Sequence, residues 1–223
     1  MDDDRFEQFA VTKRLYDDMP QEKEFIIPTR KEFQVARYLD DHGLMKDVRI
    51  IPYTHNEGYN ASKALNLGVK NSKNDYIIIT SPEVKPTTDV LQQFSESLGK
   101  NIICEVVDQD ENGNLTILVS SIYRSDTPAM YFLALFNKGD IEKINGWDED
   151  FMKGYAYEDN DFGERFVRAG LTFEVREDIK GLHQYHPRAE TIPNGTNINA
   201  RKFYENTEAG VTYCMNGINK VVK

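Results

Sequence analysis

The amino-acid sequence predicts an α/β fold with a mixed, mostly parallel sheet flanked by helices. In the first half of the chain, short runs of strand-forming residues alternate with amphipathic helical patterns, which is typical of parallel strands covered by helices. In the second half, an Asn-Gly pair separates two apolar runs, as in an antiparallel hairpin. The 223 residues suffice for one domain with its own core.

The first half opens with a helical pattern over residues 6–19, which ends at Pro20. Strands are then expected at 24–29, 48–53 and 74–80, and helices at 33–42 and 61–69. The segment 74–80 (NDYIIIT) is the clearest buried strand, because four strand formers follow one another.

The second half begins with a predicted helix over 87–99, with Val90, Leu91, Phe94 and Leu98 on one face. Further strands are expected at 102–107, 115–119, 130–136 and 172–176, and helices at 158–169 and, more weakly, 200–208. No linker divides the chain, so residues 1–190 are expected to form one domain and residues 191–223 a polar C-terminal extension.

Composition excludes several classes of function. The net charge of −10 repels polyanions, which argues against general nucleic-acid binding. The N-terminus is acidic where a signal peptide is basic, and no apolar run is long enough for a membrane span. The two cysteines, Cys104 and Cys214, match no metal or redox spacing, and Cys104 lies in an apolar run that suits a core position. We expect a cytoplasmic protein.

The first candidate site follows the strand at 74–80. Ligands of open α/β sheets bind beyond the carboxyl ends of the strands. Pro82 restricts the backbone there and presents Glu83 at a defined turn. A carboxylate in this position suits Mg²⁺ or Mn²⁺, while the alternative is a polar turn residue before a helix.

The second candidate site is an acidic cluster, Glu158, Asp159 and Asp161, in the first turn of a predicted helix. Acidic residues stabilise a helix N-terminus, and this is the alternative to a catalytic role. In the catalytic interpretation, one carboxylate binds a hydroxyl group and another removes its proton. The preceding loop favours this interpretation, because its aromatic residues could stack on a sugar: Trp147, Phe151, Tyr155 and Tyr157.

The third candidate site is the pair His183 and His186, close after a predicted strand. Imidazole is a ligand for Mn²⁺ and Zn²⁺, although such a pair is also common on protein surfaces. The sequence lacks the glycine-rich phosphate and dinucleotide motifs and the nucleophile-elbow motif of hydrolases.

Two segments resemble known glycosyltransferases. The stretch GYNASKALNLGVKNSKNDYIIITSPEV resembles the nucleotide-sugar half of family 2 glycosyltransferases with the GT-A fold, in which such a strand ends in a metal-binding acidic motif. FNKGDIEKINGWDEDFMKGYAYEDNDFGERFVRAGLTFEV is similar to the C-terminal region of galactosyltransferase-like members, with G-W-D-E-x-F, G-x-x-x-E-D-x-D and R-x-x-x-x-G in the same order. HQYHP is similar to the late metal-binding histidine of that family.

The resemblance implies an inverting, metal-dependent transfer of a hexose from a UDP-sugar to an acceptor hydroxyl, with Mn²⁺ or Mg²⁺ as cofactor. It implies that Glu83, with His186 or else His183, binds the metal. It also implies that Asp159 is the base and that Glu158 binds a sugar. The remaining residues expected to bind substrate are Trp147, Tyr155, Asn66, Lys63 and Asp161.

The first half departs from the family pattern. Ser81-Pro82-Glu83 offers one carboxylate where many relatives offer two. The family opens with a strand of the type VSVVIPxYNR, then a helix and a second strand, but here only EFIIPTRK precedes VRIIPY. Either EFIIPTRK is the first strand and a strand–helix unit is missing, or it is the second and the opening strand is absent. The helix–strand spacing favours the second interpretation, and with it a shortened nucleotide-binding half.

This departure leaves a second class of function open. The alternative is a catalytically weak or partner-dependent module that binds a sugar or a nucleotide, as a homo-oligomer or with a partner chain. An enzyme should lose turnover when Asp159 is replaced by Asn, whereas a binding module should keep its affinity.

Overall fold

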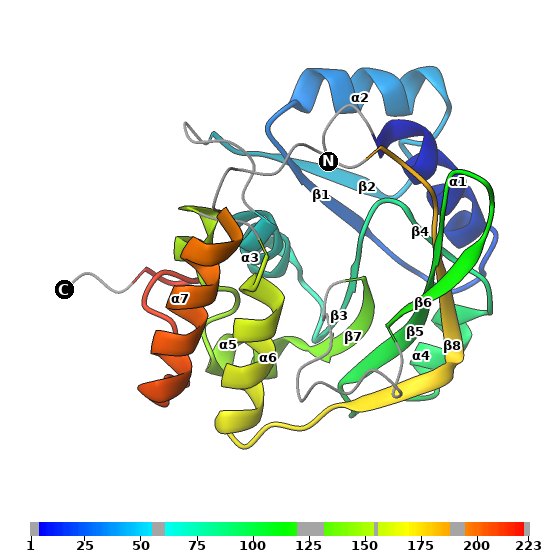
Figure 1. The fold of residues 1–223 in the computed structure, drawn as a ribbon. Helices are drawn as coiled ribbons and strands as arrows, with labels where there is room; N and C mark the ends of the chain where they lie inside the picture. The colour runs from blue at the N-terminus through cyan, green and yellow to red at the C-terminus, as the bar shows by residue number, and fades with distance from the viewer. Residues whose placement is uncertain (1–4, 55–60, 120–131, 154–155, 188–194, 221–223) are drawn as a thin grey trace.

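The computed structural model describes residues 5–54, 61–119, 132–153, 156–187 and 195–220 (Figure 1). The predicted mixed α/β architecture is confirmed. The helices are α1 (Phe6–Asp17), α2 (Glu32–Asp41), α3 (Ala61–Asn71), α4 (Val90–Ser95), α5 (Lys138–Lys143), the 3₁₀ helix η3 (Glu149–Lys153), α6 (Glu158–Arg168) and α7 (Gly195–Glu208). The strands are β1 (Phe25–Thr29), β2 (Val48–Pro52), β3 (Tyr76–Thr80), β4 (Val84–Pro86), β5 (Ile102–Gln109), β6 (Leu115–Val119), β7 (Leu133–Asn137) and β8 (Glu174–His183).

The strands form two sheets in the described residues. β1 and β2 pair in parallel as a separate two-stranded sheet, while the larger sheet has the order β3-β7-β5-β8-β4, with β6 paired to β5. In the larger sheet only β5–β8 is a parallel ladder, and the other ladders are antiparallel. The expectation of a mostly parallel sheet is therefore wrong. Parallel neighbours need crossover connections, and the strand–helix alternation that supplies them is confined to the first half of the chain.

The helices gather on either side of these sheets (Figure 1). In the view of Figure 1, α2 lies over β1 and β2 at the top, and α5, α6 and α7 lie together at the left. The main hydrophobic cluster is built on β3, β5, β7 and α6, and a smaller one joins α1, α2 and β1. Cys104 is fully buried in the main cluster, as expected, and this burial raises the pKa of its thiol well above the ordinary value.

Several element boundaries differ from the predictions. The helix expected at 87–99 is the shorter α4, which begins after Asp89, whose side chain accepts a hydrogen bond from the Gln92 backbone. Leu98, expected on its apolar face, lies beyond its end and is 56% exposed. The strand expected at 172–176 is the start of β8, which continues to His183 because its second part pairs with both β5 and β4. The short elements β4 and α5 were not anticipated.

The C-terminal segment is bound firmly to the rest of the chain. α7 packs against α6 and η3. The Asn145 side chain donates to the carbonyls of Cys214 and Asn219, and it accepts a hydrogen bond from the Asn219 backbone. The expected boundary at residue 190 lies outside the described residues, but the segment after it is no loose appendage.

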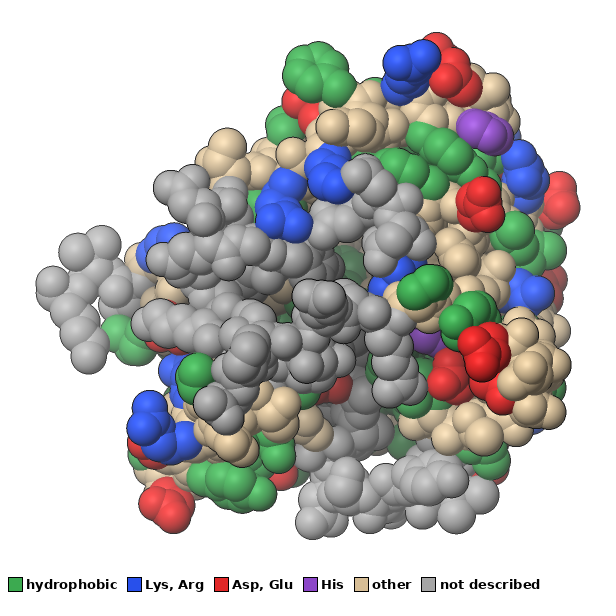
Figure 2. All heavy atoms as spheres, turned by 45° about the horizontal axis from the view of Figure 1, so that its top comes forward, with side chains coloured by type: hydrophobic (Ala, Val, Ile, Leu, Met, Phe, Trp, Pro, Cys, Tyr) green, Lys and Arg blue, Asp and Glu red, His purple; other side chains and the backbone are tan. Residues whose placement is uncertain are grey.

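Figure 2 shows one face of the molecule, on which acidic, basic and apolar side chains are interspersed among the described residues. No continuous basic patch is visible on the described part of this face, in keeping with the net charge of −10. None of the helices in the described residues has the length and apolar character needed to cross a membrane.

Candidate active site

The side chains of Glu83, His183 and His186 converge on one point. Glu83 lies in the turn between β3 and β4, and the β4–β8 ladder pairs its neighbour Val84 with His183. The Nε2 atoms of His183 and His186 lie 3.4 and 3.6 Å from the same Glu83 oxygen, Oε1. All three ligand atoms lie within 4.8 Å of one another, so they could hold a metal ion. The predicted metal ligands are thus brought together by antiparallel pairing.

Further contacts orient the two imidazole rings. His183 Nδ1 lies 2.8 Å from Oδ1 of Asp108, a residue of β5 that stands opposite His183 in the β5–β8 ladder. His186 Nδ1 lies 2.9 Å from the carbonyl of Pro187, which can only accept a hydrogen bond. The Nε2 atom of each ring therefore faces the Glu83 carboxylate, from where it could bind a metal ion. This arrangement, with a partner on the outer nitrogen, is typical of metal-binding histidines.

The charges around Glu83 favour its ionised form. Burial alone would raise the pKa of Glu83, but the hydrogen bond and charge of His183, together with the charge of Arg5, lower it. Burial would lower the pKa of His183, yet its contacts with Glu83 and Asp108 raise it. Arg5 Nε lies 3.7 Å from Glu83 Oε2, so a positive charge already stands on the far side of the carboxylate.

The acidic cluster starts α6 after an unusual backbone turn. Ala156 and Tyr157 both have positive φ, at 61° and 70°, which is uncommon and costs energy in residues other than glycine, and such strained residues cluster at active sites. Asp159 is 7% exposed. Burial, followed by the nearby charge of Glu158, raises its pKa to about 7. Asp159 can therefore gain and lose a proton near neutral pH, as a general base must.

The C-terminal helix holds this turn in place. Asn199 of α7 is buried, and its Nδ2 donates to the carbonyls of Phe151 and Ala156, at 2.9 and 2.6 Å. The ring of Tyr157 also contacts Phe203 of α7, with centroids 5.4 Å apart. The segment that the sequence marked only as a polar extension thus supports the backbone just before Glu158.

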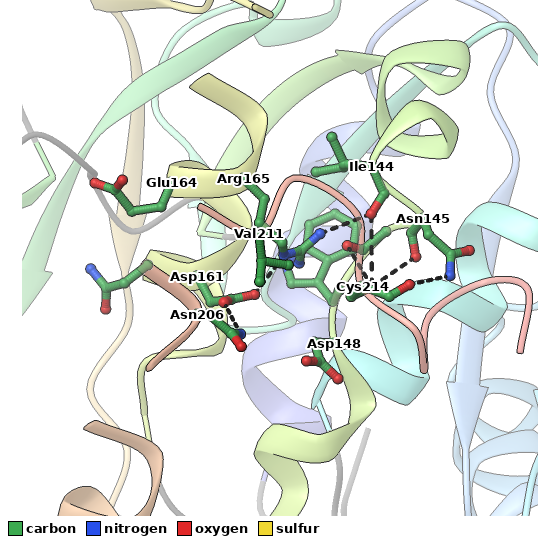
Figure 3. Close-up of polar contacts among 12 residues, drawn as sticks. Ile144, Asn145, Asp148, Asp161, Glu164, Arg165, Asn206, Val211 and Cys214 are labelled. Carbon is green, nitrogen blue, oxygen red and sulfur yellow. Dashed lines mark hydrogen bonds and ion pairs between the residues drawn. The ribbon is translucent and has the colours of Figure 1, made fainter. Parts of the chain in front are cut away.

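Asp161 is a structural residue. It is fully buried and accepts a hydrogen bond from Arg165 Nε at 2.6 Å, as part of a buried ion pair (Figure 3). Its other oxygen accepts from Asn206 of α7, and Arg165 also donates to the Ile144 carbonyl. Asp161 therefore connects α6 with α7, and the predicted contact with substrate stays a prediction.

Trp147 and Asn66 are also internal. Trp147 is fully buried and stacks on Phe162, with ring centroids 4.0 Å apart and an interplanar angle of 9°. The Asn66 side chain on α3 donates to the Trp147 carbonyl and accepts from its backbone N–H. Gly146, at φ 72°, precedes this contact, and a Cβ there would collide with the Asn66 oxygen. These residues join the two halves of the chain, and their predicted contacts with a sugar stay predictions.

Lys63 is the one predicted donor-binding residue that lines a hollow in the described structure. Its ammonium group donates to the Thr54 carbonyl and lies 5.7 Å from the Tyr53 ring centroid. The hollow, about 640 Å³, opens at the carboxyl end of β2 and is also lined by Arg30 and Phe33. Tyr155 lies outside the described residues.

Sequence reasoning missed three residues of this site: Arg5, Asp108 and Asn199. Asp108 stands in an acidic stretch, DQDENGN, that predicts only a hairpin. Its role depends on the β5–β8 register, which residue spacing does not reveal. A buried asparagine such as Asn199 likewise has no local signature, because its partners lie 48 and 43 residues away.

Comparisons with known proteins agree with this fold. Residues 132–187 match the family model described as the N-terminal domain of galactosyltransferase. A stretch of 41 residues is 49% identical to part of YfnE, an uncharacterized glycosyltransferase of Bacillus subtilis (strain 168). This stretch makes up 18% of the chain and 10% of YfnE.

Two solved structures are similar in fold. The structure of GalNAc-T7 with UDP, GalNAc and Mn²⁺ has a TM-score of 0.58 at 11% identity over 82% of the chain. S. aureus TarS has a TM-score of 0.66 at 9% identity over 91% of the chain. The chain spans only 42% and 38% of these proteins. The chain has the fold of the GT-A glycosyltransferases, and its residues 132–187 form a galactosyltransferase-like part.

Proposed function

We propose that the chain is a metal-dependent glycosyltransferase that moves a hexose from a UDP-sugar to an acceptor hydroxyl with inversion. The convergence of Glu83, His183 and His186 on one point is the observation that carries this proposal. A carboxylate and two imidazoles suit Mn²⁺, and the GalNAc-T7 relative was crystallised with UDP, GalNAc and Mn²⁺. A bound Mn²⁺ would neutralise charge on the diphosphate leaving group.

The chain's own residues would prepare the two reactants. Asp159, with its pKa near 7, would accept the proton of the acceptor hydroxyl as that oxygen attacks the anomeric carbon. Glu158, adjacent on the first turn of α6, would bind a sugar hydroxyl. The hollow beside Lys63 and Arg30, at the carboxyl end of β2, would receive part of the donor nucleotide, because two cations there suit a diphosphate.

The test is calorimetric titration of UDP with Mn²⁺ present and then with a chelator. Wild type should bind UDP only with the metal, and Glu83→Ala should lower the affinity at least tenfold. Glu96→Ala is the matched control, because this acid lies after α4 and takes no part in the cluster. UDP binding that ignores both the chelator and Glu83→Ala would refute the metal-dependent donor site.

The second function, a partner-dependent binding module, is favoured by one observation, the separation of β1 and β2 from the larger sheet. Turnover distinguishes the two functions. An enzyme releases UDP from a UDP-sugar in the presence of an acceptor, and Asp159→Asn stops this release. A binding module shows metal-dependent UDP affinity with no release at all.

A further inference from the structure

Helix α1 turns a polar stripe toward the segment that carries the two candidate histidine ligands. Arg5, Gln8 and Thr12 lie three and four residues apart, so they share one face of the helix. Arg5 Nε lies 3.7 Å from the Glu83 carboxylate, and the Gln8 side chain donates to the Tyr185 carbonyl at 3.1 Å. The apolar residues of α1 pack in the smaller hydrophobic cluster with β1 and α2, and the helix lies beside β4 (Figure 1). The small sheet thus anchors a helix that contacts the candidate metal site.

Gln184, between the two histidines in the sequence, connects this stripe with Glu83. Its Nε2 atom donates to the Glu83 carbonyl at 3.0 Å. The same atom donates to the Gln8 carbonyl at 3.1 Å and to the Thr12 hydroxyl oxygen at 3.2 Å. The backbone N–H of Gln184 donates to the Glu83 carbonyl as well, at 3.0 Å. One residue therefore links the backbone of a candidate ligand with helix α1.

The candidate ligands come from two segments whose relative position determines the site. Glu83 lies in the turn before β4, while His183 ends β8 and His186 follows it. The β4–β8 ladder ends at the pair of Val84 and His183, and the bonds from Gln184 to Glu83 extend this connection by one residue. Functional side chains have to be held within about 0.5 Å of their working geometry by contacts around them. The backbone position of Glu83 is thus a requirement of the site.

We propose that Gln184 is a positioning residue of the metal site. Its amide group, anchored on α1, fixes the backbone of Glu83 so that the carboxylate meets both histidines. An amide is suited to this task, because its two hydrogens serve acceptors in two segments at once. The inference rests on the proposed metal-dependent function. It makes α1, which lies outside the residues matched by the galactosyltransferase family model, a part of the metal centre.

Titration of Mn²⁺ into the whole chain tests the proposal, with Gln184→Met as the main variant. Methionine is about as long as glutamine but has no donor, so the hydrogen bonds are lost with little change in packing. Mn²⁺ affinity should fall at least tenfold. Gln93→Met is the matched control, because the Gln93 amide also donates to a carbonyl of β8, that of Asp178, which lies earlier on the strand than the ligands. The control should bind Mn²⁺ within twofold of wild type.

Co²⁺ supplies a readout that a general loss of stability does not change. It binds to the same kinds of nitrogen and oxygen ligands, and its visible absorption depends on their geometry. At saturating Co²⁺, Gln184→Met should shift the absorption bands, whereas Gln93→Met should give the wild-type spectrum.

Thr12→Val tests the anchor on α1. Thr12 is 2% exposed, and valine keeps its shape without the hydroxyl. Mn²⁺ affinity should fall at least threefold when Gln184 is present. It should stay unchanged when Thr12→Val is added to Gln184→Met, because the bond between the two side chains is then already absent. Thr12→Ser, which keeps the hydroxyl, should retain wild-type affinity.

Four outcomes would overturn the proposal in distinguishable ways. Absence of Mn²⁺ binding in the wild type would refute the metal-dependent function and, with it, the role of Gln184. Wild-type affinity and spectrum in Gln184→Met would overturn the positioning role alone and leave the proposed metal site unaffected. Equal losses of affinity in Gln184→Met and Gln93→Met would mean that Gln184 contributes only general stability. Additive losses from Thr12→Val and Gln184→Met would mean that α1 does not act through Gln184.

Discussion

The first region of the molecule, from α1 to β3, and the second, from β5 to α7, are stabilised in different ways. In the second region, buried polar side chains such as Asn145, Asn199 and Arg165 bind backbone carbonyls of distant segments. In the first region, the described part of the chain has β1 and β2 in a sheet of their own, separate from the sheet that contains β3. A site on α6 is therefore supported by contacts with distant segments, whereas the proposed donor site at the end of β2 belongs to a sheet of two strands.

The largest expected effect is that of Asp159→Asn. Removal of a general base lowers turnover by about 10²–10⁴-fold. The same change should stabilise the fold, because the buried carboxylate is costly when ionised. The pKa of Asp159 is about 7 in the folded chain and 3.8 ordinarily. The stability gained by Asp159→Asn is therefore absent below pH 3.8, grows between pH 3.8 and pH 7, and levels off above pH 7. At that level it is on the order of 4 kcal/mol, measured by denaturant unfolding at several pH values.

Glu158→Gln sharpens this test. The charge of Glu158 raises the pKa of Asp159, so its removal should move the ascending limb of the pH–rate profile to lower pH. An unchanged limb would mean that another group limits the reaction.

The next effect is that of breaking the buried ion pair of the second region. Asp161→Ala leaves Arg165 charged and buried, which should cost about 3–5 kcal/mol in unfolding free energy. Glu164→Ala is the matched control, because Glu164 pairs with Arg168 at the same spacing on the same helix but near the surface. The control should cost no more than about 1 kcal/mol. Equal losses of unfolding free energy in the two variants would mean that the buried ion pair stabilises the second region no more than a surface pair does.

Asp108→Ala should act on metal binding and leave the fold intact. Without the Asp108 contact the His183 ring loses its orientation, and loss of such a partner typically lowers metal affinity about 10–100-fold. Titration of Mn²⁺ measures this effect, with the exposed Asp178→Ala as control. Unaltered Mn²⁺ affinity would mean that His183 is not a ligand.

The smallest effect is expected where the two regions meet. Asn66→Ala leaves the buried N–H and carbonyl of Trp147 without their partner on α3. The expected cost is about 1–3 kcal/mol. Hydrogen exchange should show faster opening of β1 and β2 and little change in β5 and β8. Uniform acceleration throughout the chain would show that the two regions open as one unit.

Much of this molecule was predictable from local sequence. The buried strand at 74–80, the hairpin at Asn112-Gly113 and the helix that begins near Glu158 all follow from patterns within a few residues. The three candidate metal ligands were also identified, because carboxylates and histidines after strands are recognisable in a sequence. Their convergence was not, because it depends on the antiparallel register of β4 and β8.

The sequence by itself determined the fold class, the order of most elements and the residue types available for chemistry, since these depend on periodicity and composition. Only the tertiary structure decided which of the acidic and aromatic residues are internal. Asp161 and Trp147 look like site residues in the sequence, but packing against Arg165 and Phe162 buries them. The same holds for the division of the strands into two sheets, because strand neighbours are set by contacts between residues far apart in the chain, where local patterns carry no information.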